Sequence, residues 1–294
     1  MKVLVTGAHG KVGRATSKAL VAAGHEVIET DLSRPIFERK DEGAPQYIQA
    51  DLTDAGQAFS VVRGVDAVVH IAAIPEPTGN APAVVFQTNL MTTFNVLEAA
   101  VSFGVKRFVN ISSETATGFF FAERPFLPDY APVDELHPMK PQDPYALSKM
   151  FGEKLMDAAV ARSDIKCISI RPSWVQYEAN YSRNLGPQVR DASLLSPSLW
   201  SYIDLYDLAD AIVLATESKL AGHEVFYIAS PDNIGGRDFA EILKKYYGDK
   251  IALKPLARKD SSGISSEKAQ KLLGWKPKRS WSDYLDKDGQ PKNK

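Results

Sequence analysis

Short apolar runs alternate with longer amphipathic runs along the first part of the chain. The short runs are rich in Val, Ile and Leu and lie at residues 2–7, 26–31, 46–52, 66–73, 107–113 and 166–172. The longer runs have apolar side chains at helical spacing and lie at residues 11–25, 54–62, 84–104 and 144–162. Strands that are apolar on both faces and alternate with helices are typical of a parallel sheet covered on both sides. The pattern therefore predicts an α/β fold with a doubly wound parallel sheet over residues 1–172.

The pattern becomes irregular after residue 172. Residues 173–200 are polar and aromatic without a clear period, and a helical run at 204–218 and a strand-like run at 224–230 follow. We expect residues 173–294 to form a smaller substrate-binding cap that is partly interleaved with the sheet. The polar residues 286–294 at the end are expected to fray.

Composition and charge exclude several classes of function. The 294 residues are 44% hydrophobic and carry a formal net charge of −1, so nothing favours nucleic acid or an anionic membrane as a partner. No apolar run approaches the ~20 residues of a membrane span, and the first strand-like run is too short for a signal peptide. The single cysteine, Cys167, lies in an apolar run; we expect it to be buried, in a protein of the reducing cytoplasm. The five histidines are scattered, so we expect no metal.

A glycine-rich segment, TGAHGKVG, joins the first predicted strand to the first predicted helix. Its glycines allow a tight turn and let a pyrophosphate approach backbone N–H groups at a helix N-terminus. This is the context that a dinucleotide-binding fingerprint requires. The residues of this segment that we expect to bind NAD are Gly7, His9, Gly10, Lys11, Val12 and Gly13.

The second predicted strand ends in an acid, Asp31. An acid at this place accepts hydrogen bonds from the adenosine ribose and repels a 2′-phosphate, which favours NAD over NADP. Arg34 argues the other way, because an arginine can pair with a 2′-phosphate. For Arg34 itself we expect a solvated position on the surface.

Further cofactor contacts are expected where the third and fourth strands end. Asp51 and Leu52 close the third run, and Asp51 would lie near the adenine or, as an equal alternative, cap the following helix. Ala72 and Ala73 close the fourth run. Their small side chains would let the ligand approach the backbone.

Two segments contain a tyrosine four residues before a lysine. DPYALSK contains Tyr145 and Lys149, and YYGDK contains Tyr246 and Lys250. On a helix this spacing puts both side chains on one face. Spacing alone does not distinguish a catalytic pair from a surface pair.

Taken together, the motifs resemble the extended short-chain dehydrogenase/reductases, in particular the NAD-dependent epimerase/dehydratase family. The motifs that carry the resemblance are TGAHGKVG, Asp31, ADLTD, VVHIAA, TNLMTTFNVLEAA, RFVNISS, DPYALSK and ISIRP, followed by YIDLYDLADAIVLA and SSEKAQKLLGWKP. The resemblance implies a Rossmann sheet over residues 1–172. It also selects DPYALSK over YYGDK, because no strand ending in serine precedes the latter.

The resemblance implies a catalytic set made of a serine, a tyrosine and a lysine. Tyr145 would exchange the hydroxyl proton while hydride moves to or from the nicotinamide. Lys149 would lower the pKa of the tyrosine from its ordinary value of about 10 and hold the nicotinamide ribose. Ser113 would hydrogen-bond the reacting oxygen, and Ser112 would point the other way. Ser112, Tyr145 and Lys149 are also counted among the cofactor-binding residues. Asn89 is counted with them, although we interpret its position in the family as structural.

Nucleotide-linked sugars are the substrates of the best-known members of the resembled family. Many of those enzymes bind the nucleotide phosphates with an arginine at a position where this chain has Trp200 or Ser201. The missing arginine and the short chain argue against a large diphosphate-linked substrate. Arg190 or Arg258 could still supply the missing charge.

The segment RPSWVQYEANYSR resembles the corresponding stretch of uronate dehydrogenases. There an arginine near the position of Arg183 pairs with the sugar carboxylate, and Tyr177 lies in the same stretch. Glu114 and Thr115 replace substrate-contacting groups of those enzymes, and an ionised Glu114 would repel a carboxylate. A neutral sugar is therefore as credible as a sugar acid, and a surface salt bridge is the alternative for Arg183.

Three functions remain as hypotheses. The leading one is an NAD-dependent oxidoreductase of a sugar or sugar-acid substrate, acting as a homodimer through the two long helices. The alternative is a nucleotide-sugar epimerase or dehydratase of the UDP-glucose 4-epimerase type, in which hydride returns to the substrate. The third is a non-catalytic NAD(P)-sensing regulator, which the presence of Ser113, Tyr145 and Lys149 disfavours. The aromatic residues 118–142 are either a lid over the substrate or a packed loop.

Overall fold

The computed structural model describes residues 1–33 and 44–292. These residues form two compact units, each assembled from three segments of the chain. Unit 1 contains Met1–Ser112, Asp143–Ile170 and Ala209–Val225, and unit 2 contains Ser113–Gln142, Arg171–Leu208 and Phe226–Lys294. The division at residue 172 that the sequence suggests stays a prediction.

The central element is a seven-stranded sheet with the strand order β10-β7-β5-β4-β1-β2-β3. Its strands are β1 (Lys2–Thr6), β2 (Glu26–Asp31), β3 (Gln46–Gln49), β4 (Ala67–His70), β5 (Arg107–Ile111), β7 (Lys166–Pro172) and β10 (His223–Ile228). The pairings from β3 through to β7 are parallel. From β1 the chain builds outward in one direction to β3 and then in the other, so β1 and β4 flank the point where the order reverses. The predicted doubly wound α/β fold is confirmed.

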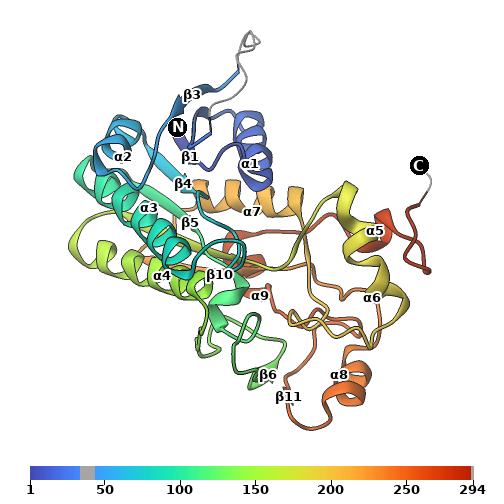
Figure 1. Cartoon of the computed structure of the whole chain (residues 1–294). Helices are drawn as coiled ribbons and strands as arrows, with labels where there is room; N and C mark the ends of the chain where they lie inside the picture. The colour runs from blue at the N-terminus through green and yellow to red at the C-terminus, as the bar shows by residue number, and fades with distance from the viewer. Residues whose placement is uncertain (34–43, 293–294) are drawn as a thin grey trace. The chain divides into compact units, whose positions relative to one another are not determined.

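Helices cover both faces of the sheet in unit 1 (Figure 1). They are α1 (Lys11–Ala22), α2 (Ala55–Val62), α3 (Pro82–Ser102), α4 (Pro144–Arg162) and α7 (Leu205–Glu217), of which α7 begins in unit 2. Apolar side chains between α2, α3, α4 and the sheet form a core that contains Leu4, Val68, Phe108 and Cys167. Burial raises the pKa of the Cys167 thiol to about 12, as suits a packed side chain rather than a nucleophile.

Unit 2 is built from short elements around an aromatic core. These are η1 (Glu114–Thr117), β6 (Tyr130–Ala131), β8 (Val175–Gln176), η2 (Glu178–Asn180), α5 (Tyr181–Asn184), α6 (Gly186–Arg190), β9 (Ile203–Asp204), α8 (Phe239–Tyr247), β11 (Ala252–Leu253), α9 (Glu267–Leu273) and α10 (Trp281–Tyr284). Trp200, Tyr202 and Phe239 are fully buried in its core. Phe119 belongs to the same core and stacks on Phe120, with the ring centroids 4.5 Å apart, so the aromatic loop packs at least partly into unit 2.

The C-terminal residues are more ordered than their polarity predicts. Asp286 Oδ1 accepts hydrogen bonds from the backbone N–H groups of Asp288 and Gln290, each at 2.9 Å. The N–H of Lys292 donates to the carbonyl of Tyr284 at 2.8 Å. The expectation of a frayed end is therefore wrong as far as residue 292, because an acid that binds its own turn holds the segment in place.

No helix in the described part of the chain is long and apolar enough to cross a membrane. Among residues 1–33 and 44–292, no three His, Cys, Asp or Glu side chains gather in a way that could hold a metal ion.

Candidate active site

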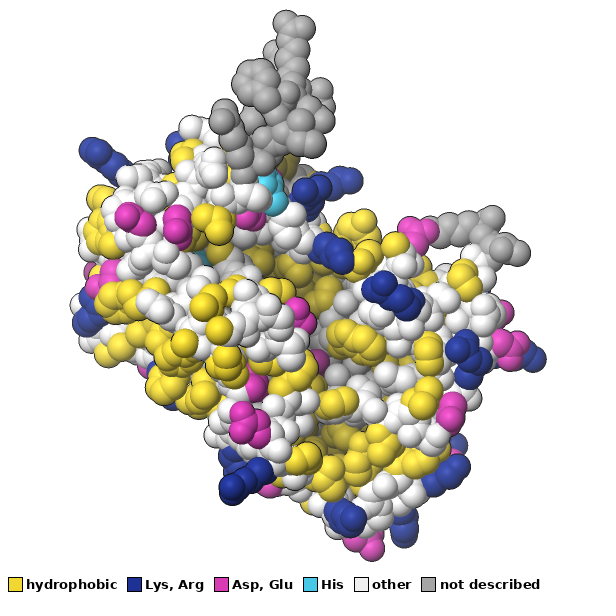
Figure 2. All heavy atoms as spheres, in the orientation of Figure 1, with side chains coloured by type: hydrophobic (Ala, Val, Ile, Leu, Met, Phe, Trp, Pro, Cys, Tyr) yellow, Lys and Arg dark blue, Asp and Glu magenta, His cyan; other side chains and the backbone are white. Residues whose placement is uncertain are grey.

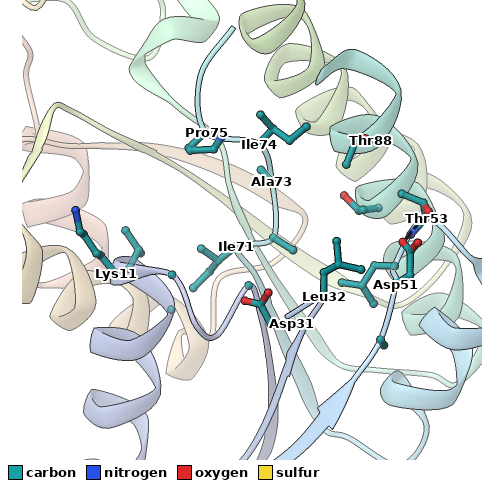
Figure 3. A pocket seen from close by; sticks show the side chains of 18 residues that line it. Lys11, Asp31, Leu32, Asp51, Thr53, Ile71, Ala73, Ile74, Pro75 and Thr88 are labelled. Atoms are coloured by element: carbon teal, nitrogen blue, oxygen red, sulfur yellow. Dashed lines mark hydrogen bonds between the residues drawn. The ribbon is translucent and has the colours of Figure 1, made fainter. Parts of the chain in front are cut away.

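A pocket of about 530 Å³ lies in unit 1 at the carboxyl ends of the central strands (Figure 3). The predicted cofactor residues that line it are Gly7, Gly10, Lys11, Val12, Gly13, Asp31, Asp51, Leu52, Ala72 and Ala73. The lining residues that sequence reasoning missed are Leu32, Ala50, Thr53, Ile71, Ile74, Pro75, Thr88 and Thr92. Most of these lie within two positions of a predicted residue, so the same motifs could have indicated them as pocket residues. Thr88 and Thr92 come from α3 and lie in the motif TNLMTTFNVLEAA, of which only Asn89 was singled out.

The glycine loop has a geometry that no other residue type would allow. Gly7 has φ +65°, and a Cβ there would lie 2.8 Å from the backbone of Ala72. A Cβ on Gly13 would lie 2.2 Å from the carbonyl oxygen of Gly7. Gly10 is the N-cap of α1, and no side chain caps this helix. A helix N-terminus without a side-chain cap is a site where backbone N–H groups bind anions, so the loop fits a dinucleotide pyrophosphate.

Asp31 lies at the end of β2 on the wall of the pocket. Its Oδ2 accepts a hydrogen bond from the N–H of His9 at 3.0 Å, which ties the acid to the glycine loop. The His9 ring is not part of the pocket lining and stacks on Tyr47, with the centroids 4.6 Å apart. Arg34, the residue that argued for NADP, lies outside the described residues.

Asp51 does not cap the helix that follows it. Its Oδ1 accepts hydrogen bonds from the N–H and hydroxyl of Thr53, at 2.9 and 2.6 Å. The cap of α2 is Asp54, which accepts from the N–H of Gln57 at 2.8 Å. The sequence left open whether Asp51 lies near the adenine or caps the following helix. The structure rules out the cap, because Asp54 caps α2. Asp51 instead closes a turn on the wall of the pocket.

Asn89 on α3 fastens one wall of the pocket. Its side chain accepts from the N–H of Ile74 at 2.7 Å and donates to the carbonyl of Ile74 at 3.0 Å. The same amide donates to Ser148 Oγ on α4 at 3.2 Å. Asn89 does not line the pocket and joins the loop after β4 to α4.

Tyr145 and Lys149 lie on the first turns of α4. The helix begins with Asp143 as N-cap, whose Oδ1 accepts from the N–H of Ala146 at 2.9 Å, and with Pro144 at the first position. Lys149 Nζ lies 5.6 Å from the centroid of the Tyr145 ring and donates to the carbonyl of Ile111 at 2.8 Å. Burial lowers the pKa of Lys149 to about 8. A lysine held at the end of β5 and beside the tyrosine ring has the placement that the predicted pair requires.

The second tyrosine–lysine segment has no such arrangement. Tyr246 is in α8, which ends at Tyr247 and is followed by Gly248, so Lys250 lies beyond the helix. Tyr246 is close to Trp200 instead, with the ring centroids 6.0 Å apart. Spacing in the sequence did not reveal this difference, since it depends on where the helix ends.

The two serines after β5 point to different partners. Ser112 Oγ donates to Glu153 Oε1 on α4 at 2.5 Å, within unit 1. Ser113 is the first residue of unit 2, and its Oγ accepts from the N–H and the hydroxyl of Thr115 at 3.1 and 3.0 Å. With two donors already directed at it, the Ser113 hydroxyl has its own proton available to donate.

Glu114 is the candidate substrate residue whose surroundings the sequence least reveals. It is only 5% exposed, and its carboxyl group accepts hydrogen bonds from Ser173 at 2.7 Å and Ser198 at 3.3 Å. Burial raises the pKa of Glu114 to about 8 despite these hydrogen bonds and one from the Trp174 backbone. The side chain is therefore mostly protonated and uncharged at neutral pH.

The other candidate substrate residues lie just before η2, on α5 and on η1 in unit 2. Tyr177 is half-buried and precedes η2, and its N–H donates to Asn180 Oδ1 at 2.8 Å. Arg183 is exposed on α5, and its Nε donates to Asn184 Oδ1 at 3.3 Å. Thr115 is buried beside Ser113.

Comparison with known proteins agrees with this site. Residues 3–229 match the model of the NAD dependent epimerase/dehydratase family. The chain is 29% identical to the UDP-glucose 4-epimerase of Lacticaseibacillus casei, over 94% of this chain and 92% of the relative. It is 28% identical to the uronate dehydrogenase of Pseudomonas putida, over 78% of this chain and 76% of the relative.

A solved structure shares the fold over almost the whole chain. A short-chain dehydrogenase/reductase superfamily protein from Agrobacterium tumefaciens, solved with bound NAD, has a TM-score of 0.71 and is 24% identical, covering 98% of this chain and 96% of its own. The family match includes the glycine loop, Asp31 and the tyrosine–lysine pair. The chain belongs to the NAD-dependent epimerase/dehydratase family, and NAD is its cofactor.

Proposed function

We propose that the protein oxidises a hydroxyl group of a small sugar or sugar acid that carries no nucleotide. NAD, held by the glycine loop and Asp31, supplies the hydride acceptor. Tyr145 takes the hydroxyl proton, and Lys149 favours the tyrosinate that this requires. Ser113 donates its hydroxyl proton as a hydrogen bond to the reacting oxygen. The products are a carbonyl compound, NADH and a proton.

The burial of Trp200 is the observation that carries this choice of substrate. Trp200 or its neighbour Ser201 stands at the position where many enzymes of the resembled nucleotide-sugar group have a phosphate-binding arginine. Trp200 is fully buried, and its indole N–H donates to the carbonyl of Ala192 at 3.2 Å. Its neighbour Ser201 is also fully buried and accepts from Ser262 at 2.7 Å. Neither position offers a positive charge for a diphosphate.

The two arginines that could replace the missing charge are already engaged. Arg258 forms two parallel hydrogen bonds with Asp260, at 2.5 and 2.9 Å. Arg190 donates to the carbonyl of Asp288 at 3.2 Å. The bidentate pair with Asp260 would compete with a diphosphate for the guanidinium of Arg258. This supports a substrate without a diphosphate.

The protonated state of Glu114 removes one objection to a sugar acid. The carboxyl group would repel an acidic substrate only when ionised, and burial keeps it mostly neutral at pH 7. Arg183 is exposed in the same unit and has the fork geometry that binds a carboxylate. We therefore place uronic acids beside neutral aldoses in the substrate class.

A UDP-glucose 4-epimerase is the second candidate. It is supported by a relative of that name that aligns over nearly the whole of both chains. In this reaction the hydride returns to the substrate and no NADH accumulates.

A substrate panel distinguishes the two functions. Purified protein is mixed with NAD and, in separate reactions, with uronic acids, aldoses and UDP-glucose, while NADH absorbance is followed. We expect NADH to accumulate with at least one free sugar or sugar acid. Conversion of UDP-glucose to UDP-galactose without NADH accumulation, together with silence on every free sugar, would establish the epimerase instead.

The proposal includes a homodimer through α3 and α4. These helices expose Val84, Met91, Phe94 and Phe151, and hydrophobic side chains gather over them in Figure 2. A large exposed apolar surface on a pair of packed helices is typical of a protein interface.

The cytoplasmic location is part of the same proposal, on the basis of the single buried thiol of Cys167.

A further inference from the structure

His70 is a buried residue to which the cofactor and catalytic motifs assign no role. It is the last residue of β4 and is 2% exposed. Its ring packs near Phe108, with the centroids 6.0 Å apart. Burial and the charge of Lys149 lower the pKa of His70 to about 3, so the ring is neutral at physiological pH.

The hydrogen bonds around His70 define which ring nitrogen carries the proton. Thr6 Oγ1 accepts from the N–H groups of Ile71 and Ala72, at 3.0 and 3.1 Å, and lies 2.9 Å from His70 Nδ1. With both its acceptor sites used, this hydroxyl donates to Nδ1. Thr93 Oγ1 donates to the carbonyl of Asn89 at 2.8 Å and lies 3.2 Å from His70 Nε2. Nε2 therefore carries the proton and donates to Thr93, so the neutral ring uses its one donor and its one acceptor.

One end of this chain of hydrogen bonds reaches the cofactor pocket. Thr6 directly precedes Gly7, and Ile71 and Ala72, which it binds, line the pocket. The backbone of Ala72 is also the surface that leaves no room for a side chain at Gly7. His70 thus fixes the place where the loop after β4 meets the glycine loop.

The other end reaches the turn that contains Tyr145. Thr93 binds the carbonyl of Asn89, and the side chain of Asn89 donates to Ser148 Oγ at 3.2 Å. Ser148 Oγ in turn donates to the carbonyl of Tyr145 at 2.7 Å. All these residues belong to unit 1.

We propose that His70, as a neutral imidazole bonded to Thr6 and Thr93, is a positioning residue that keeps the Tyr145 turn in register with the cofactor loops. Hydride and proton transfer need the tyrosine hydroxyl, the substrate and the nicotinamide in one alignment, and a displacement of about 1 Å can cost about a hundredfold in rate. The inference rests on the proposed role of Tyr145. It adds a residue that lies behind the described lining of the cofactor pocket.

The test compares variants that remove hydrogen-bonding groups of this chain with variants that keep them. Thr93→Val keeps the side-chain shape and removes the hydroxyl that accepts from Nε2 and donates to the carbonyl of Asn89. Thr93→Ser keeps the hydroxyl and loses only a methyl group. His70→Leu removes both bonds. Phe108→Leu, which damages the same part of the core without touching a hydrogen bond, is the control for lost packing.

Amide hydrogen exchange of the NAD-bound protein is the first readout, because it needs no substrate. We expect faster exchange across residues 144–149 in Thr93→Val and His70→Leu, and exchange close to wild type in Thr93→Ser and Phe108→Leu. In the substrate assay kcat should fall roughly tenfold to a hundredfold in the first two variants, with KM of the substrate changed by less than about twofold.

Equal behaviour of Thr93→Val and Thr93→Ser in both readouts would overturn the inference. So would wild-type exchange across residues 144–149 in His70→Leu. If His70→Leu does not fold, the threonine pair decides alone. A protein that oxidises none of the sugars would refute the proposed function, while the exchange results would still decide the role of His70.

Discussion

Tyr145→Phe is expected to lower kcat by roughly 10²–10⁴-fold, the usual contribution of a general acid or base. The change removes one hydroxyl and leaves the ring, which is 8% exposed, in its packed position. NAD binding should change little, because the glycine loop and Asp31 line a pocket whose lining does not include Tyr145. Steady-state kinetics and calorimetric titration with NAD measure the two effects separately.

Tyr246→Phe is the matched control for this prediction. Tyr246 also precedes a lysine by four residues, but Lys250 lies beyond the end of α8. Its hydroxyl should be dispensable, with kcat within about twofold of wild type, far from the roughly 10²–10⁴-fold loss expected for a catalytic group. If Tyr145→Phe keeps the wild-type kcat, Tyr145 is not the acid/base, and the non-catalytic regulator regains support.

Glu114→Gln is expected to change how stability depends on pH. Burial raises the pKa of Glu114 from 4.5 to about 8, so between these pH values the folded protein holds a proton that the unfolded chain releases. The contribution of Glu114 to the free energy of unfolding is fully present below pH 4.5, falls as pH rises toward 8, and is constant above it. The slope is about 1.4 kcal/mol per pH unit within this window.

Glutamine does not ionise, so the free energy of unfolding of the variant should lack this contribution to its pH dependence. Relative to wild type, Glu114→Gln should gain stability as pH rises from 5 to 8.5, by a few kcal/mol in order of magnitude. Urea unfolding at several pH values measures the difference, and the exposed Glu123 changed to Gln serves as the control. Parallel stability curves for wild type and Glu114→Gln would mean that the folded protein ionises Glu114 at an ordinary pH.

The sequence predicted the parts of the site that depend on local chain geometry. The glycine loop, Asp31 and the tyrosine–lysine pair each lie in one continuous segment, where turn and helix periods decide which side chains share a face. Helix boundaries were harder to predict, since the sequence offered Asp51 as a possible cap and the structure shows that Asp54, three residues later, caps α2. The same limit hid the difference between Lys149 and Lys250.

Contacts between distant segments were not predictable. Glu114 is mostly neutral because the folded chain buries it, and the hydrogen bonds from Ser173 and Ser198, 59 and 84 residues away, oppose this effect only in part. His70 is linked to Thr6 and Thr93 across 64 and 23 residues. A single sequence contains no signal for such pairings, so Glu114 was considered as a possible charge and His70 only as one of five scattered histidines.

The most direct test of the account follows the hydrogen that leaves the sugar. The protein is incubated with NAD and a uronic acid or aldose deuterated at the carbon that is oxidised, and both products are analysed by mass spectrometry. The account predicts that deuterium appears in NADH released to solution, in equal amount to the oxidised sugar. Deuterium that is found only in a stereoisomer of the starting compound, without free NADH, would contradict it.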